Sequence, residues 1–212
     1  MDKIDFGGFP RINHLNLAEF LHDIGKFSTW TIEPYGRHRF IKHDDVGAKM
    51  VVELLKRWKF SKKQIEYISC MIKNHIYPSN VIIAPDLNEK VIMRYIRKMG
   101  DNVIDNIILA RADRLSARGV DVTENMVQAN LNGLAALLNT YLEKKETLKP
   151  LPKLLDGKEI MSILNVQPSP LLGNVINALK EAQLNGEVNT REEAVYFIKE
   201  WYRENHFNRS GI

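Results

Sequence analysis

The chain is poor in cysteine: Cys70 is the only one among 212 residues. A single thiol excludes an internal disulfide, so packing must hold the fold together, as is usual in reducing compartments. The sequence also lacks any apolar run near the roughly 20 residues that a membrane helix needs. Its N-terminus does not show the basic, apolar and small-residue order of a secretory signal. These absences predict a soluble, cytoplasmic protein that does not enter membranes.

Internal repeats and low-complexity segments are absent as well. Hydrophobic residues make up 44% of the chain and charged residues 26%, which is the balance of an ordinary globular protein. The length allows one well-packed domain, or one domain with a small appendage. The formal net charge of +4 mildly favours an anionic partner such as nucleic acid or a phosphorylated substrate, although many basic proteins bind neither.

Apolar residues recur at helical spacing along most of the chain, which predicts an all-α fold. One stretch departs from this pattern: in Ser28–Ile41, two short β-prone segments flank Pro34 and Gly36, and we expect a β-hairpin there. The predicted helices before residue 143 are Leu15–Ile24, Val46–Trp58, Ile65–Ile76, Val91–Met99, Val103–Leu115 and Met126–Leu142.

Helix-capping residues support these assignments. Asp44 and Ser61 precede predicted helices and are expected to cap them. Thr190 and Glu193 have the spacing of a capping box, in which each residue accepts a hydrogen bond from the backbone amide of the other. A final helix is therefore predicted after Thr190.

Two prolines, Pro150 and Pro152, remove backbone donors and disfavour a continuous helix, which makes this the best domain boundary. We predict a larger helical domain over residues 1–150 and a small helical appendage over residues 151–212. The helices predicted in the appendage are Gly157–Leu164, Leu171–Leu184 and Arg191–Tyr202.

The adjacent pair His22 and Asp23 follows an apolar helix and precedes Gly25, a helix stop signal. Neighbouring helical side chains diverge by about 100°, so these two converge only around something that another element helps to hold. A divalent cation fits, because imidazole nitrogen with carboxylate oxygen suits Mn, Fe, Ni, Zn or Mg. Alone, such a pair is more often a surface or capping feature, so the interpretation depends on its companions.

Three further residues could join this pair: His43 after the hairpin, His75 at the end of an apolar helix, and Asp113 within another. A carboxylate on the buried side of a helix is costly unless a metal or a donor compensates it. Each residue also has an ordinary alternative. Asp113 could pair with a nearby arginine, His75 could simply favour a helix C-terminus, and His43 could be a plain hairpin residue. The residues alone leave these alternatives open.

The motifs that carry a family resemblance extend along nearly the whole chain. They are Leu21–Lys26, Gly36–Phe40, His43–Ala48, Phe60-Ser61, Asn74-His75, Arg111–Asp113, Leu155–Met161 and Leu179–Val188. In this order they resemble the HD domain and the RNA-contacting region of bacterial CCA-adding tRNA nucleotidyltransferases and related poly(A) polymerases. The resemblance implies an HD-domain helical bundle that hydrolyses phosphate esters, such as 2′,3′-cyclic phosphates or nucleotides. It also implies one or two divalent metals, with the ligands His22, Asp23, His43, His75 and Asp113.

The chain departs from this family pattern in two places. The pattern has a further His on an earlier helix, which completes one metal site with His22, Asp23 and Asp113. His14 lies eight residues before His22, about 12 Å along a helix, too far for both to bind one ion. The chain also lacks the Gly-Ser and Asp-x-Asp elements that hold two metals for nucleotide addition. We therefore expect a shortened relative, or a fragment, that does not add nucleotides by itself.

The leading hypothesis is metal-assisted hydrolysis of a nucleotide or RNA phosphate ester, with Asp23 as a bridging ligand. Lys26 would supply positive charge to the phosphate, although it could equally be a solvated lysine at a helix end. The residues expected to contact RNA or phosphate are Lys26, Arg37, Arg111 and Arg114.

The alternative is a non-catalytic RNA-binding body, in which residues 151–212 grip the backbone of a tRNA or similar RNA. Trp201, Tyr202 and Phe207, near Arg203 and Arg209, would then be stacking groups, unless they form a helix face that packs on the core. A third possibility is a regulatory or scaffold domain that keeps the fold with an inactive site.

Overall fold

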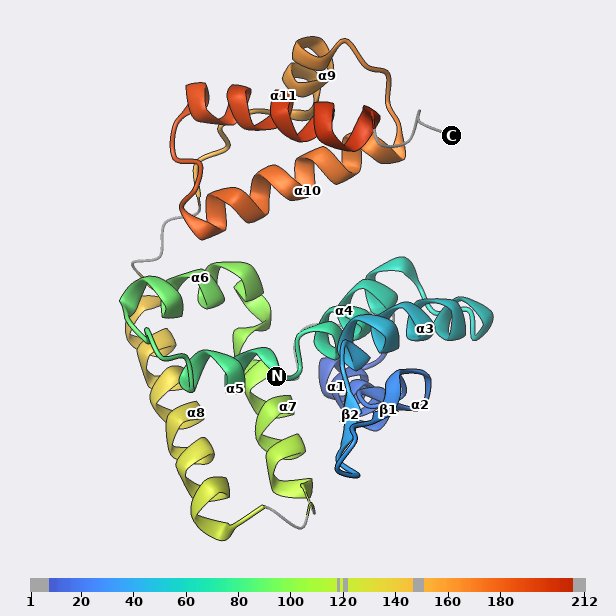
Figure 1. Ribbon diagram of the computed structural model, residues 1–212, viewed down its shortest axis with the longest axis vertical. Helices are drawn as coiled ribbons and strands as arrows, with labels where there is room; N and C mark the ends of the chain where they lie inside the picture. The colour runs from blue at the N-terminus through green and yellow to red at the C-terminus, as the bar shows by residue number, and fades with distance from the viewer. Residues whose placement is uncertain (1–7, 118, 120–121, 147–150, 208–212) are drawn as a thin grey trace. The chain divides into compact units, whose positions relative to one another are not determined.

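A computed structural model describes residues 8–117, 119, 122–146 and 151–207 of the chain. The described part is almost entirely helical, and the chain divides into two compact units, residues 1–146 and 147–212 (Figure 1). The predicted all-α fold with a short β-hairpin is confirmed. None of the described helices is both long and apolar enough to span a membrane.

The described part of the first unit contains eight α-helices, one 3-10 helix (η1) and one two-stranded sheet. These elements are α1 (Arg11–Leu21), α2 (Lys26–Thr29), β1 (Trp30–Ile32), β2 (His38–Phe40), α3 (His43–Arg57), α4 (Lys62–Lys73), α5 (Tyr77–Ile82), α6 (Glu89–Met99), η1 (Gly100–Asn102), α7 (Val103–Ser116) and α8 (Glu124–Lys144).

The hairpin is shorter than its sequence pattern suggests. β1 and β2 pair antiparallel, with Trp30 opposite Phe40, and each strand has only three residues. Thr29 belongs to α2 instead of β1, and its hydroxyl donates to the Gly25 carbonyl. Gly36 adopts a φ of 80° in the turn, a conformation that glycine tolerates without strain. Both strands are largely exposed, so the hairpin is a surface feature.

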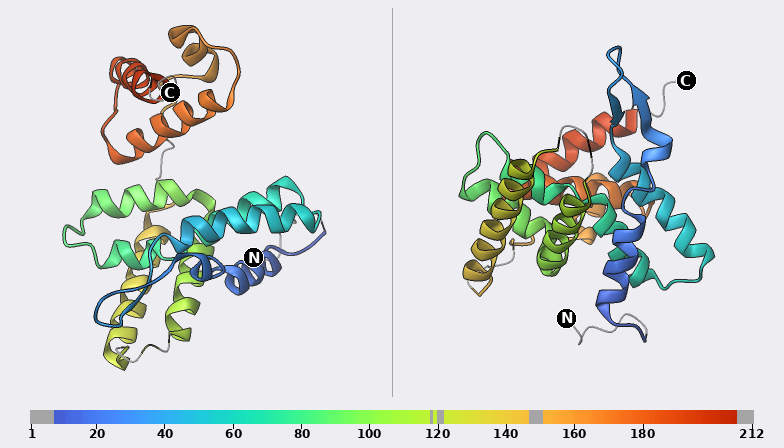
Figure 2. Two further views of the ribbon diagram at one scale, coloured as in Figure 1. Left: turned by 45° about the vertical axis from the view of Figure 1, so that its right-hand side comes forward. Right: turned by 90° about the horizontal axis from the view of Figure 1, so that it is seen from below.

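The core of the first unit lies between helices that pack pairwise. α4 packs against both α1 and α3, and α7 packs against α1 and α8. Figure 2 shows α7 and α8 side by side, with α5 against the same pair. Their buried apolar faces follow the helical spacing of the sequence. Side chains below 2% exposure in this core include Val51, Leu55, Ile68, Met71, Ile72, Tyr95, Leu109 and Leu134.

A buried ion pair also joins α1 to α7. The Arg11 guanidinium donates to the Asp105 carboxylate, and the two residues are 7% and 4% exposed. Tyr67 of α4 donates its hydroxyl to the same carboxylate at 2.6 Å. A second Arg11 nitrogen donates to the Asn102 side chain at 2.7 Å. One carboxylate therefore links α1, α4 and α7.

The capping predictions have mixed outcomes. Ser61 forms a capping box with Gln64 at the start of α4, as a cap was predicted there. Thr190 and Glu193 exchange the two hydrogen bonds of their predicted capping box. The prediction for Asp44 is wrong, because α3 begins at His43. Its N-cap is Lys42, two residues before Asp44, in a left-handed conformation. Asp44 lies in the first turn instead, where its charge is favourable to the helix dipole.

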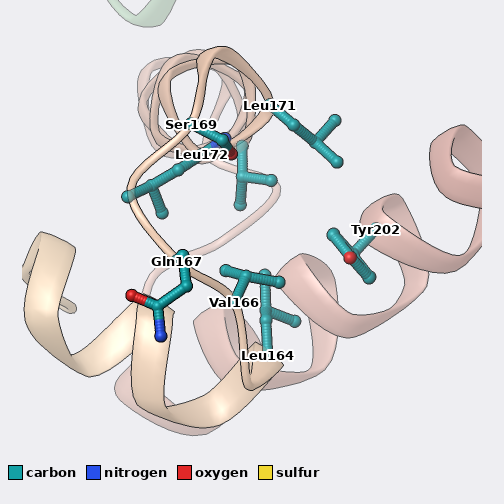
Figure 3. Close-up of a pocket in the computed structure, with 8 residues that line it drawn as sticks. Leu164, Val166, Gln167, Ser169, Leu171, Leu172 and Tyr202 are labelled. Carbon is teal, nitrogen blue, oxygen red and sulfur yellow. The ribbon is translucent and has the colours of Figure 1, made fainter.

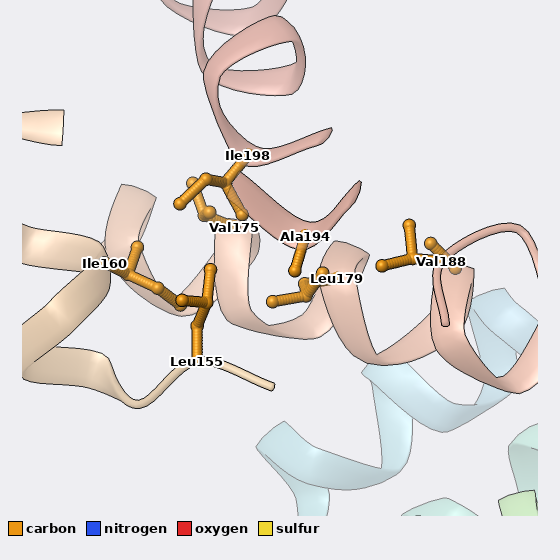
Figure 4. Close-up of a cluster of buried hydrophobic side chains, with 8 residues drawn as sticks. Leu155, Ile160, Val175, Leu179, Val188, Ala194 and Ile198 are labelled. Atoms are coloured by element: carbon orange, nitrogen blue, oxygen red, sulfur yellow. The ribbon is translucent and has the colours of Figure 1, made fainter. Parts of the chain in front are cut away.

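The second unit is a three-helix cluster of α9 (Gly157–Leu164), α10 (Pro170–Asn185) and α11 (Arg191–Phe207). Its three helices match the predicted ones closely. Figure 4 shows the buried side chains that hold them together. The core residues are Leu155, Ile160, Val175, Leu179, Ala182, Val188, Ala194 and Ile198.

Trp201 and Tyr202 pack against this core and are partly buried. Figure 3 shows Tyr202 beside a cavity of about 330 Å³ whose other walls include Leu171 and Leu172. The structure therefore favours the packing interpretation for both aromatic residues over a free stacking surface. Arg209 and the Phe207 side chain lie outside the described residues.

Candidate metal centre

The His22-Asp23 pair lies in a turn immediately after α1. The amide of Ile24 donates to the Leu21 carbonyl at 3.0 Å, and that of Lys26 donates to the Asp23 carbonyl at 2.9 Å. The His22 backbone keeps right-handed helical dihedral angles, so the two side chains meet through their own reach. His22 Nε2 lies 3.3 Å from Asp23 Oδ2, so the pair converges on one point.

A close approach of two backbones brings the start of α3 to this turn. A Cβ atom added at Gly25 would lie 2.0 Å from the His43 carbonyl oxygen and 2.7 Å from the Gly47 amide nitrogen. A side chain at residue 25 is therefore incompatible with the contact. Because His43 is the first residue of α3, the glycine determines how near His43 comes to the His-Asp pair.

We expect Gly25→Ala to lower the free energy of unfolding by about 1–3 kcal/mol, because the backbone must move on both sides of the contact. The same movement should weaken divalent metal binding. Thermal unfolding and metal titration of the purified variant measure both effects. Gly173→Ala is the matched control, since a Cβ there meets nothing within 4 Å. An unchanged melting temperature with unchanged metal affinity in Gly25→Ala would contradict the proposed contact.

The structure brings all five predicted ligands together. His43 Nε2 lies 3.5 Å from Asp23 Oδ1 and 3.2 Å from His75 Nε2. His75 is 1% exposed in the break between α4 and α5. Asp113 of α7 extends a carboxylate oxygen to 3.3 Å from His22 Nε2. This ion pair is with a histidine. Neither Arg111 nor Arg114 forms an ion pair with Asp113 among the described residues, and Arg118 lies outside them.

The three histidines share one arrangement of their ring nitrogens. Nδ1 of His22, His43 and His75 faces the carbonyl oxygen of Glu19, Phe40 and Ile72, respectively, three residues earlier in each case. The nitrogen–oxygen distances are 2.5, 2.8 and 2.7 Å. A carbonyl can only accept, so Nδ1 carries the proton and a neutral ring presents the lone pair of Nε2. Histidine ligands of metals are commonly oriented in this way.

The donor set fits a divalent cation. One ligand atom from each of His22, Asp23 and His75 lies within 4.8 Å of the others. His22 Nε2 and Asp23 Oδ1 are buried without a hydrogen-bond partner within the described part of the chain. Buried polar atoms without partners are costly, and an ion at this point would satisfy both. Imidazole and carboxylate together suit Mn, Fe, Ni or Zn.

The electrostatics of the cluster are those of a site that accommodates positive charge. Burial lowers the pKa of His22, but Asp113 and Asp23 outweigh it and raise the pKa to about 10. Burial raises the pKa of Asp23, yet the nearby positive charges of His22 and Lys26 bring it well below its ordinary value. The pKa of His75 is lowered, chiefly by burial. A protonated His22 carries one positive charge between two carboxylates, and metal binding through its Nε2 displaces that proton.

Of the four predicted phosphate contacts, Lys26 is in the cluster. Its ammonium nitrogen lies 2.6 Å from Asp23 Oδ2 and 5.6 Å from the centre of the Phe40 ring. Arg37 is exposed in the turn of the hairpin, and Arg111 is exposed on α7. Arg114 is partly buried and lines a pocket with Asp113. No hydrogen bond or ion pair among the described residues joins these arginines to the cluster.

Two further residues near the cluster were not identified from the sequence. Glu19 has a buried carboxylate oxygen with no partner among the described residues. Burial raises its pKa; His22 lowers it, and Asp113 and Asp23 raise it, which places Glu19 within electrostatic range of the cluster. Its spacing of three residues before His22 was the available signal. Asn130 of α8 is the other residue, and no local pattern marks it.

Comparison with known proteins agrees with this geometry. The model of the HD domain family matches residues 4–118, and the chain therefore belongs to the HD domain family. It is 32% identical over 191 residues, 90% of its length, to the A-adding tRNA nucleotidyltransferase of Deinococcus radiodurans. It is 34% identical over 189 residues, 87% of its length, to the CC-adding tRNA nucleotidyltransferase of Thermus thermophilus. The chain spans only 42% and 39% of these two relatives.

Proposed function

We propose that the chain is a metal-dependent phosphohydrolase that cleaves phosphate esters of nucleotides or RNA ends, such as 2′,3′-cyclic phosphates. The supporting observation is the convergence of three imidazole Nε2 atoms and two carboxylates, with each Nδ1 facing a backbone carbonyl. A preorganised set of this kind resists reorganisation when it binds a cation. Membership of the HD domain family favours the same chemistry.

Each residue has a role in this proposal. One divalent ion would draw its ligands from His22, Asp23 and Asp113. A second would draw its ligands from Asp23, His43 and His75, so both ions would share Asp23. A bound cation polarises a phosphoryl oxygen and makes a neighbouring water a better nucleophile. Lys26 supplies a further positive charge, which Asp23 orients at 2.6 Å, for an oxygen of the phosphate.

Glu19 is a candidate to act on a water molecule at the cluster, because His22, Asp113 and Asp23 all affect its pKa. Its unpartnered oxygen is a buried acceptor, and it lies on the same helix as the start of the His-Asp turn. A carboxyl group with a raised pKa releases and accepts a proton more readily near neutral pH than an ordinary one. We therefore assign Glu19 to orienting the attacking water or accepting its proton.

The first experiment is metal analysis of full-length chain purified without a metal-affinity tag. We expect near-stoichiometric Mn, Fe, Ni or Zn, and hydrolysis of bis(p-nitrophenyl) phosphate and adenosine 2′,3′-cyclic phosphate. Removal of the metal with EDTA should abolish both activities, and adding the metal back should restore them. A chain that binds none of these ions, nor Mg, in a calorimetric titration would disprove the hydrolase proposal.

A second candidate function is a tRNA-binding body. It is favoured by the similarity to two tRNA nucleotidyltransferases, which extends over about nine tenths of the chain and so includes the second unit. In this reading the basic residues contact backbone phosphates, and affinity for tRNA falls steeply as salt rises. Filter binding of tRNA at 50 and 200 mM salt tests it. Equal, weak retention at both concentrations would count against it.

A further inference from the structure

A pocket of about 550 Å³ opens beside the metal cluster, between α5, α7 and α8. Asp113, one of the five candidate ligands, lines it, and Arg114 is the next residue along the same wall. Ligand pockets commonly measure about 300–1,000 Å³, so this one has room for a nucleoside. Whatever binds in it lies next to the cluster.

Two polar side chains line this pocket. Arg114 comes from α7 and Asn130 from α8, so two helices bring a guanidinium and a carboxamide to the same pocket. Arg114 Nε and Asn130 Oδ1 are buried, and neither makes a hydrogen bond within the described part of the chain. A guanidinium suits an anionic group and a carboxamide suits a hydrogen-bonding edge. The two side chains therefore suit a ligand that has both parts.

Most of the remaining lining residues are apolar, and two of them are unusually exposed. Ile83 is 70% exposed and Met126 is 51% exposed, and both line the pocket. Exposed large apolar side chains around a cavity indicate a binding surface. Methionine adapts its shape readily to flat, polarisable rings. A planar, weakly polar group such as a nucleobase suits this surface better than a bare sugar phosphate does.

We propose that this pocket binds the nucleoside of the substrate and places its terminal phosphate at the metal cluster. The base lies between Ile83 and Met126, and the Asn130 side chain bonds to its hydrogen-bonding edge, as Asn does to bases elsewhere. Arg114 contacts the phosphate, because a guanidinium is suited to that anion. The inference rests on the proposed hydrolase function and assigns the pocket that would hold the nucleoside of its substrate, either free or at an RNA end.

Binding is tested with adenosine 2′,3′-cyclic phosphate titrated into the full-length, EDTA-treated chain and followed by NMR, so that no hydrolysis intervenes. Ribose 5-phosphate, which lacks the base, is the comparison ligand. Ala129 lines the pocket from the exposed side of α8, so Ala129→Trp should obstruct it without disturbing the core. Ala135→Trp, exposed on the same helix outside the pocket, is the matched control.

We expect Ala129→Trp and Asn130→Ala each to raise the Kd for the cyclic nucleotide by about tenfold. For Asn130→Ala this loss is equivalent to one good hydrogen bond, whereas Ala129→Trp obstructs the pocket. Both variants should leave the Kd for ribose 5-phosphate unchanged. Arg114→Gln should weaken both ligands. Ala135→Trp should weaken neither. Equal affinity for the two ligands, or a nucleotide Kd that Ala129→Trp and Asn130→Ala leave unchanged, would overturn the proposal.

The same variants, loaded with metal, separate this inference from the function on which it rests. If bis(p-nitrophenyl) phosphate is hydrolysed but the nucleotide has no preference over ribose 5-phosphate, the pocket proposal fails and the hydrolase proposal remains. If the nucleotide binds in the pocket but no phosphoester is cleaved, the hydrolase proposal fails and the pocket still binds nucleotides. A short RNA ending in a 2′,3′-cyclic phosphate, compared with the free nucleotide in kcat/KM, shows which source of the nucleoside the chain prefers.

Discussion

The Asp23→Asn variant is expected to purify without bound metal and to lose more than about 100-fold of the phosphodiesterase rate, since even residues outside the ligand set cost 10–100-fold. In the unaltered chain, the carboxylate oxygens of Asp23 lie 3.3 Å from His22 Nε2, 3.5 Å from His43 Nε2 and 2.6 Å from the Lys26 ammonium. An amide has the same shape but no charge, and one of its two groups becomes a donor. Elemental analysis and hydrolysis of bis(p-nitrophenyl) phosphate measure the two effects.

Asp86→Asn is the matched control for this variant. It makes the same chemical change at an exposed residue whose side chain has no hydrogen bond or ion pair among the described residues. Metal content and hydrolysis should equal those of the unaltered chain. If Asp23→Asn kept its metal and its rate while folding normally, Asp23 would not be a ligand and the cluster would need another interpretation.

Much of the candidate site was predicted through the family resemblance, because the residues alone left ordinary alternatives open for His43, His75 and Asp113. Periodicity predicted most of the helices that carry these residues. It extended the first of them to Ile24, whereas α1 ends at Leu21 and the His-Asp pair lies in the turn that follows. How closely this turn meets α3 depends on tertiary packing, which no local pattern shows.

The residues missed from the sequence depend on tertiary packing. Asn130 is one of several polar residues on α8, and only the position of α8 against α5 and α7 brings this residue to the pocket. The helices α2 and α5 were also missed, because four and six residues are too short to show a periodic pattern. Gly25 looked like a simple helix stop, whereas its lack of a Cβ permits the contact with His43.

Arg11→Met is expected to lower the free energy of unfolding by about 3–5 kcal/mol, because it leaves the Asp105 carboxylate as an uncompensated buried charge. The Tyr67 hydroxyl, 2.6 Å from that carboxylate, cannot neutralise it. Arg39→Met is the matched control: Arg39 pairs with Glu33 at 2.7 Å, but both side chains are substantially exposed, so its loss should cost less than about 1 kcal/mol. Chemical denaturation followed by circular dichroism gives both values.

The double variant Arg11→Met with Asp105→Leu distinguishes charge from packing. If the isolated charge causes the loss, the double variant should recover much of the stability that the single variant loses; equal instability would assign the effect to lost packing instead. The Arg11–Asp105 pair also joins α1, which precedes His22, to α7, which carries Asp113. His22 Nε2 and the Asp113 carboxylate lie 3.3 Å apart. Metal affinity should therefore fall together with stability in Arg11→Met and stay unchanged in Arg39→Met. A less stable protein with unaltered metal affinity would mean that other contacts, such as that at Gly25, fix the cluster.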